Sequence, residues 1–107
     1  MQIPEPVATF VGVINRQDSE AFLGAFSADG FVDDWGRVFT GRQEIAAWSD
    51  REFIGSRGTL TPQEVTTDDD GVVTVVGDWR STHANGLSSF AFAVEGGRIA
   101  SLTIREG

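Results

Sequence analysis

Apolar positions near the start of the chain recur with the 3.6-residue period of an α-helix. The residues that share this apolar face are Val7, Phe10, Val11 and Ile14. Proline is tolerated in the first turn of a helix, so the helix is expected to begin near Pro4–Pro6. Asp18 is a residue type that caps helix N-termini, and it predicts a second short helix from Ser19 to Phe26.

A short strand and a third helix are predicted in the middle of the chain. Phe31 to Trp35 is typical of a strand, and Gly36-Arg37 of a turn after it. Thr40-x-x-Gln43 resembles a capping box, so the third helix is expected to follow directly. The residues along the inner side of that helix are Ile45, Trp48 and Phe53.

From Leu60 onward the period of the apolar pattern changes from 3.6 to 2, which indicates strands. The predicted strands are Leu60–Thr67, Val72–Thr82, Leu87–Val94 and Arg98–Arg105. The hairpin signals between them are Asp70-Gly71, Asn85-Gly86 and Gly96-Gly97. Gly77 interrupts the longest strand and indicates a bulge or a bend. Helices followed by an antiparallel meander define an α+β fold, with helices covering one face of a curved sheet.

Composition narrows the class of protein. A chain of 107 residues suits a single domain over 1–107 that buries roughly two-thirds of its unfolded surface. The net charge of −8 and the lack of a basic patch argue against nucleic-acid binding. No apolar run is long enough for a membrane span, and the N-terminus lacks the pattern of a signal peptide. The absence of cysteine fits a cytoplasmic protein, and no cofactor or metal motif is present.

The outer face of the predicted sheet suggests a partner. In the strand Leu87–Val94, the small residues Ser89, Ala91 and Ala93 oppose the large apolar ones, which would leave a flat surface. A second copy of the chain could pack on that surface, so we expect a homodimer. Arg37 and Arg80 are expected to be solvated or to lie on this dimer face.

The order of these elements resembles that of a known family. The features that carry the resemblance are Asn15-Arg16-Gln17-Asp18, Phe26-Ser27-Ala28-Asp29-Gly30, Phe31-Val32-Asp33-Asp34-Trp35-Gly36, Thr40-Gly41-Arg42-Gln43-Glu44-Ile45 with Trp48, and Gly96-Gly97-Arg98-Ile99-Ala100-Ser101-Leu102. Together they resemble the nuclear transport factor 2-like superfamily, in its SnoaL-like and ketosteroid isomerase-like branch. The resemblance implies a conical barrel, in which three N-terminal helices pack in the concavity of a curved, mainly antiparallel sheet around a pocket.

The resemblance also implies a general base. Asp34 stands where the isomerases carry their catalytic aspartate, and alternation allows only one of Asp33 and Asp34 to face the pocket. Desolvation beside an apolar pocket would raise the pKa of that carboxyl and suit it to proton abstraction next to a carbonyl. Phe10 and Phe90 stand near the positions of the tyrosine and the protonated aspartate that stabilise the enolate in isomerases. Neither can donate a hydrogen bond, which makes steroid isomerase activity a poor fit.

The remaining candidates are one histidine and a set of aromatic residues. His83 is the only histidine, and it is either an acid/base partner of Asp34 or a surface residue of a turn. The aromatic residues that could line a pocket for a small apolar ligand are Phe10, Phe26, Trp35, Trp48, Trp79, Phe90 and Phe92. Three functions stay open: a cofactor-independent cyclase, isomerase or dehydratase with Asp34 as base, a non-catalytic binder of a small ligand, and a dimeric interaction module.

Overall fold

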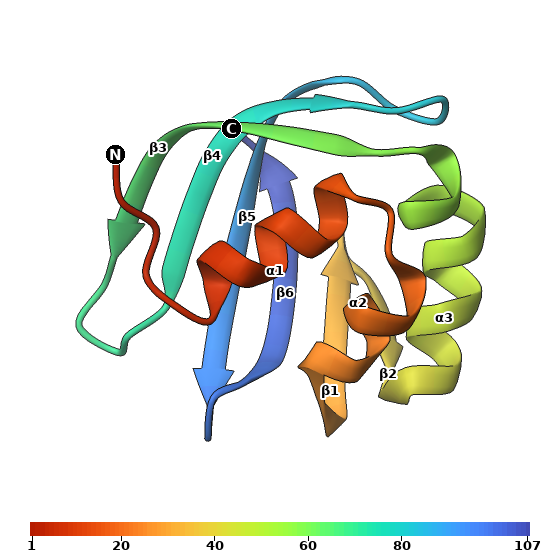
Figure 1. Cartoon of the computed structure of the whole chain (residues 1–107), viewed down its shortest axis with the longest axis horizontal. Coiled ribbons are helices and arrows are strands. Elements are labelled where there is room, and N and C mark those ends of the chain that lie inside the picture. Colours follow the sequence, from red (N-terminus) through yellow and green to blue (C-terminus); the bar gives the residue numbers. More distant parts are fainter.

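The computed structural model describes all 107 residues, with the helices before most of the strands (Figure 1). The elements are α1 (Val7–Asn15), α2 (Ser19–Ala25), β1 (Phe26–Asp34), β2 (Arg37–Thr40), α3 (Gly41–Glu52), a 3₁₀ helix η1 (Ile54–Ser56), β3 (Thr59–Thr67), β4 (Val73–Arg80), β5 (Gly86–Glu95) and β6 (Arg98–Glu106). The α+β class expected from the order of helical and strand patterns is therefore confirmed.

All six strands form one curved sheet in the order β2-β1-β6-β5-β4-β3. Every neighbouring pair is antiparallel except β1 and β6, which run parallel. The helices lie on one face of this sheet, and β3 and β4 bend over α1 (Figure 1). The sheet has two free edges, β2 and β3, so strand pairing does not close it into a barrel.

The core lies between the helices and the inner face of the sheet. It contains 21 apolar residues, and the apolar face predicted for the first helix is buried as a whole. Phe10 packs against three other rings, those of Phe22, Phe26 and Phe92, at centroid distances of 5.1, 5.5 and 5.7 Å. Edge-to-face and stacked contacts of this kind stabilise beyond the area that they bury. This phenyl cluster joins α1, α2, β1 and β5.

Local signals for caps and turns account for several element boundaries. The side chain of Asp18 accepts a hydrogen bond from the amide of Ala21 at 3.1 Å, which confirms it as the N-cap of α2. Gly96-Gly97 forms a tight turn with positive φ at both residues. Gly77, where a bulge or a bend is predicted, pairs with Pro62 at a register shift between Pro62 and Glu64 of β3, and a Cβ on Gly77 would lie 2.3 Å from the carbonyl oxygen of Thr61.

Two predictions about β1 were wrong. The second helix ends at Ala25, and Phe26 begins the strand instead of closing the helix. Trp35 lies in the turn after the strand, with φ of 55°, so the turn is Trp35-Gly36 and not Gly36-Arg37. Pairing with β6, which is distant in sequence, extends the strand at its start. Left-handed backbone at two successive residues matches the twist of a hairpin and shortens the strand at its end.

Two further predictions need correction. The side chain of Thr40 does not cap α3; instead Glu44, not Gln43, reaches back and accepts the amide hydrogen bond of Thr40 at 2.8 Å. Asn85-Gly86 is not a two-residue turn, because β4 ends at Arg80 and a loop over residues 81–85 leads to β5. Asn85 closes this loop by accepting a hydrogen bond from the amide of Ser81. The longer loop is important for the site described below.

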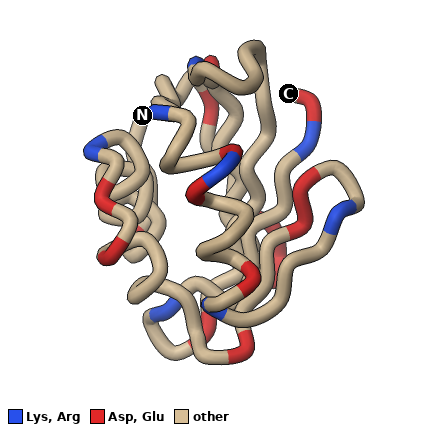
Figure 2. Tube along the Cα trace, turned by 90° about the vertical axis from the view of Figure 1, so that its right-hand side faces the viewer, with Lys and Arg blue, Asp and Glu red and all other residues tan.

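The outer face of the sheet carries small side chains together with exposed apolar ones. Ser89, Ala91 and Ala93 are half-buried, as expected for the side away from the core, and Phe31 and Val38 are exposed near β2. Acidic and basic residues are spread along the chain without a basic patch (Figure 2). No helix combines the length and apolarity that crossing a bilayer requires. The homodimer stays a prediction.

Candidate functional site

A cavity of about 590 Å³ lies at the end of the sheet where β1 and β6 end and β5 begins. Its walls come from β1, α3, β4, β5, β6 and the loop over residues 81–85. This volume falls in the range of small-molecule sites. The loop that replaced the expected two-residue turn forms one side of the cavity.

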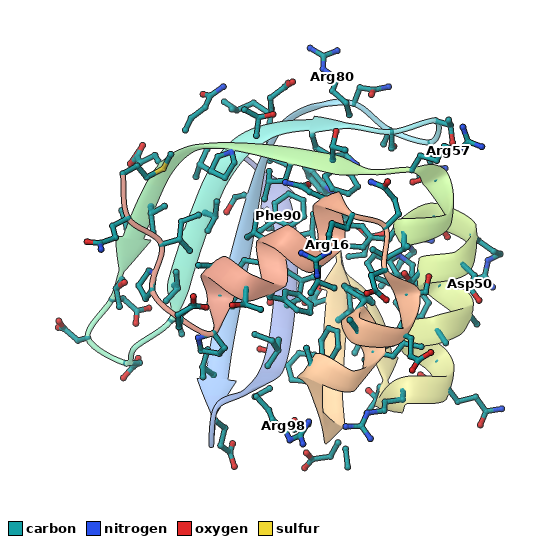
Figure 3. The ribbon with its side chains drawn as sticks, viewed as in Figure 1. Arg16, Asp50, Arg57, Arg80, Phe90 and Arg98 are labelled. Carbon is teal, nitrogen blue, oxygen red and sulfur yellow. The ribbon has the colours of Figure 1, made fainter.

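Stacked aromatic rings form the inner wall of the cavity. Phe53 lies between Trp48 and Trp79, with ring centroids 4.8 and 4.7 Å away, and Trp79 contacts Phe90 at 5.5 Å. In the view of Figure 3, Phe90 appears just above α1. All four side chains are at most 6% exposed, so the wall is held rigidly by packing. A rigid apolar wall favours a ligand with its own apolar surface.

Gly58 positions Trp79 in this wall. A Cβ at Gly58 would lie 2.0 Å from Cη2 of Trp79, so a residue with any side chain would displace the indole. Trp79 therefore lies directly against the backbone after η1. This contact joins segments about twenty residues apart, so no local pattern in the sequence indicates it.

Asp34 lies in the wall of the cavity, and its side chain is 14% exposed. Its Oδ2 atom accepts a hydrogen bond from Nε1 of Trp48 at 3.0 Å and pairs with the guanidinium of Arg37. Its Oδ1 atom has no protein partner. Since no buried side-chain oxygen or nitrogen lacks a hydrogen bond, Oδ1 must reach solvent. One carboxylate oxygen is thus held in place and the other is free to meet a ligand.

Arg37 links Asp34 to a second carboxylate. Its Nη1 and Nη2 atoms donate to Glu52 at 3.1 and 2.6 Å, and Nη2 also donates to Asp34. Hydrogen bonding to Glu52 raises the pKa of Arg37, and the same contact lowers the pKa of Glu52 below its ordinary value. The guanidinium thus favours the ionised form of Glu52. The sequence predicted that Arg37 would be solvated or lie on the dimer face. In the structure it is also part of the site.

His83 extends this network from the loop. Its Nε2 atom lies 3.2 Å from Oε1 of Glu52, so the order of contacts is Asp34, Arg37, Glu52 and His83. The loop is also anchored by Thr82, whose amide donates to the carbonyl of Ser56 at 2.9 Å. The structure brings His83 and Asp34 to the same cavity, with two charged side chains between them.

The structure separates the other predicted residues into two groups. Trp35, Trp48, Trp79 and Phe90 line the cavity, although the side chain of Trp35 is 60% exposed at its rim. The residues that belong to the phenyl cluster and do not line it are Phe10, Phe26 and Phe92. Phe10 borders a separate hollow beside α2 and the Gly96-Gly97 turn.

Asp33 lies away from the cavity, as alternation along β1 requires. Its carboxylate accepts a hydrogen bond from Arg105 at 3.0 Å and another from the amide of Gly36 at 2.8 Å. The bond with Arg105 lowers the pKa of Asp33 and raises that of Arg105. Asp33 thus stabilises the tight turn, while Asp34 lines the cavity.

Reasoning from the sequence missed Arg37, Glu52 and Phe53 as parts of the site. Trp48 and Glu52 are four residues apart on α3 and so share one helix face. This spacing could have placed Glu52 in the site beside Trp48. Arg37 follows Asp34 by three residues across a turn, and that turn was placed one residue too late. No group of three or more metal-binding side chains converges anywhere in the chain.

Comparison with solved structures shows which fold this is. A candidate polyketide cyclase from Sinorhizobium meliloti is 23% identical with a TM-score of 0.82, covering 96% of this chain and 95% of that one. The epoxide hydrolase/cyclase-like enzyme SalBIII, described in pyran ring formation in the polyether salinomycin, is 20% identical with a TM-score of 0.83 over 94% of this chain and 87% of that one. An NTF2-like protein of unknown function from Cytophaga hutchinsonii is 14% identical with a TM-score of 0.80 over 98% and 91%.

At 14–23% identity these likenesses show the fold alone, and that fold is the NTF2-like one implied by the resemblance. No protein-family model and no curated protein matches the chain in sequence. The fold class is therefore fixed by structure, and the function has to be argued from the cavity itself.

Replacing Arg37 with Gln should lower the free energy of unfolding by about 1–2 kcal/mol near pH 7, because two largely buried carboxylates lose their cation. The pKa of Glu52 lies below its ordinary value in the folded state, so this stabilisation is complete above that ordinary value. It is lost as the pH falls through the lowered pKa. Urea unfolding near pH 7 and about pH 3 should therefore show a smaller difference between variant and wild type in acid.

The matched control is Arg16→Gln, because Arg16 is exposed and forms no ion pair. Arg16→Gln should change the free energy of unfolding by no more than about 0.5 kcal/mol at both pH values. Equal losses for Arg37→Gln in neutral and acid solution would show that the pair with Glu52 does not contribute through charge.

Proposed function

We propose that the protein is a cofactor-independent enzyme of the cyclase or isomerase type, in which Asp34 accepts a proton from a small apolar carbonyl compound. The observation that carries the proposal is the carboxylate of Asp34 in the cavity wall, with Oδ2 held by Trp48 and Arg37 and Oδ1 free. A base must be fixed, ionised and accessible on the side of the substrate. The aromatic wall supplies the apolar surface for such a substrate.

The chemistry of a carboxylate limits the substrate. A carboxylate is a weak base, so it acts best on an acidic carbon. The proton between two carbonyl groups is more acidic than one beside a single carbonyl, so a β-dicarbonyl compound fits the site better than a simple ketone.

His83 is the second group proposed to take part in proton transfer. It lies at the cavity rim beside Glu52, and imidazole can both donate and accept a proton near neutral pH. The cyclase-like proteins of similar fold agree with this class of reaction, although their low identity carries only the fold.

A second candidate is a binding protein without catalysis. Phe90 lines the cavity and cannot stabilise an enolate by hydrogen bonding, whereas the family resemblance implies a protonated aspartate near this position in the isomerases. A cavity with an apolar wall and a tethered carboxylate would still hold a small ligand.

Deuterium exchange distinguishes the two candidates. Ethyl 2-oxocyclohexanecarboxylate is incubated in D2O with and without the protein, and NMR follows loss of the proton between its two carbonyl groups. We expect exchange at least about 10²-fold faster than in buffer, the usual contribution of a positioned base. Binding without faster exchange, detected by quenching of tryptophan fluorescence, would reject catalysis and support the binding protein.

A further inference from the structure

One residue that lines the cavity carries a hydrogen-bond donor that the family resemblance does not imply. Trp79 was expected only as part of an apolar wall. Its indole Nε1–H forms no hydrogen bond within the chain, although the side chain as a whole is only 6% exposed. No buried side-chain nitrogen or oxygen lacks a partner, so this Nε1 cannot be fully buried and must reach solvent.

The donor belongs to a side chain that lines the cavity. Trp79 points to the inner face of the sheet, with Phe53 stacked on the indole and Phe90 on another side. A Cβ at Gly58 would lie 2.0, 2.1 and 3.1 Å from Cη2, Cζ2 and Cε2 of the indole, so Gly58 covers that edge of the ring. Trp79 is one of the residues that line the cavity.

Trp48 shows how the two buried indoles differ. Its Nε1 donates to Oδ2 of Asp34 at 3.0 Å and is not available to a ligand. Arg37 is likewise committed to Asp34 and Glu52. Among these donors, only Nε1–H of Trp79 has no partner. The cavity therefore has one unpaired donor on Trp79 and one unpaired acceptor, Oδ1 of Asp34.

We propose that the indole N–H of Trp79 donates a hydrogen bond to a carbonyl oxygen of the ligand and to the oxyanion formed when Asp34 removes the proton. The inference rests on the proposed carbonyl ligand. Trp79 would supply the oxyanion donor that Phe10 and Phe90 cannot provide. This donor comes from β4, whereas Phe10 lies on α1 and Phe90 on β5. The negative charge that develops on oxygen during proton abstraction would be stabilised by a dipole that packing fixes in place.

The three tryptophans allow a direct test by NMR. All three line the cavity, and each gives one indole N–H signal in a ¹H–¹⁵N spectrum. Trp35→Phe removes and thereby assigns one signal, Asp34→Asn shifts the signal of Trp48, and the remaining signal is that of Trp79. Adding 1-indanone should move the Trp79 signal downfield, whereas indane, which lacks the oxygen, should not.

Trp79→Phe then measures the contribution to affinity. Binding of 1-indanone should weaken about tenfold, a typical effect of losing a neutral hydrogen bond in a desolvated site, while binding of indane should change little. Equal weakening for both compounds, or a Trp79 signal that responds equally to both, would overturn the proposal. These readouts need no turnover, so the hydrogen bond from Trp79 can be detected even if the protein does not accelerate deuterium exchange. Conversely, exchange can be accelerated even if the Trp79 signal does not respond to 1-indanone.

Discussion

Replacing Phe10 with alanine should lower the free energy of unfolding by about 3–5 kcal/mol, a large part of the stability of a domain of this size. Phe10 is 2% exposed and contacts Phe22, Phe26 and Phe92. Truncation would leave a cavity among three rings from different elements, which cannot collapse without moving α1. Urea unfolding followed by circular dichroism measures the loss.

The control is Phe31→Ala, which removes a ring of the same size from the outer face of the sheet. Phe31 is 38% exposed, so its loss should be well below that of Phe10. Similar losses for both variants would show that the outer face is covered in solution, and would support the predicted dimer. A loss under about 1 kcal/mol for Phe10→Ala would contradict the role of the phenyl cluster in the core.

Replacing Asp34 with asparagine should lower the rate of proton exchange by about 10²–10⁴-fold, because an amide cannot accept the proton. Asparagine has the same shape and keeps an oxygen that can accept from Trp48, so the fold and the affinity for ligand should largely persist. Deuterium exchange measures the rate, and tryptophan fluorescence measures binding in the same samples.

Asp33→Asn is the matched control, since it makes the same chemical change one residue earlier. Asp33 is bound to Arg105 and Gly36 and does not line the cavity. Exchange should stay within about threefold of wild type, as expected for a change away from the reacting atoms. If both variants lost the same activity, Asp34 would not be the base, and the effect would come from the shared turn.

The helices and hairpins were predictable because their signals are local. The N-cap at Asp18, the apolar face of α1 and the turn at Gly96-Gly97 depend on neighbouring residues only. The start of β1 was not predictable, because Phe26 is extended by pairing with Ile99, more than seventy residues later. The same limit applies to Trp35, whose conformation follows from the geometry of the hairpin.

The candidate site was predictable in part. Resemblance to a family located Asp34, and alternation placed Asp33 and Asp34 on opposite sides. Arg37 and Glu52 could not be paired from sequence, because their contact depends on how β2 sits against α3. Phe10 lies in the core and does not line the cavity with Asp34, and a periodic apolar position does not reveal which of these surroundings it has.

The position of β6 determines when the sheet can be completed during synthesis. β1 and β2 leave the ribosome early, but in the finished sheet β1 is joined to the other strands only through β6, the last strand to emerge. Until then the hairpin of β1 and β2 and the meander of β3 to β5 remain separate. Contacts so distant in sequence slow folding. Until β6 pairs with both β1 and β5, the helices cannot be covered by one continuous sheet.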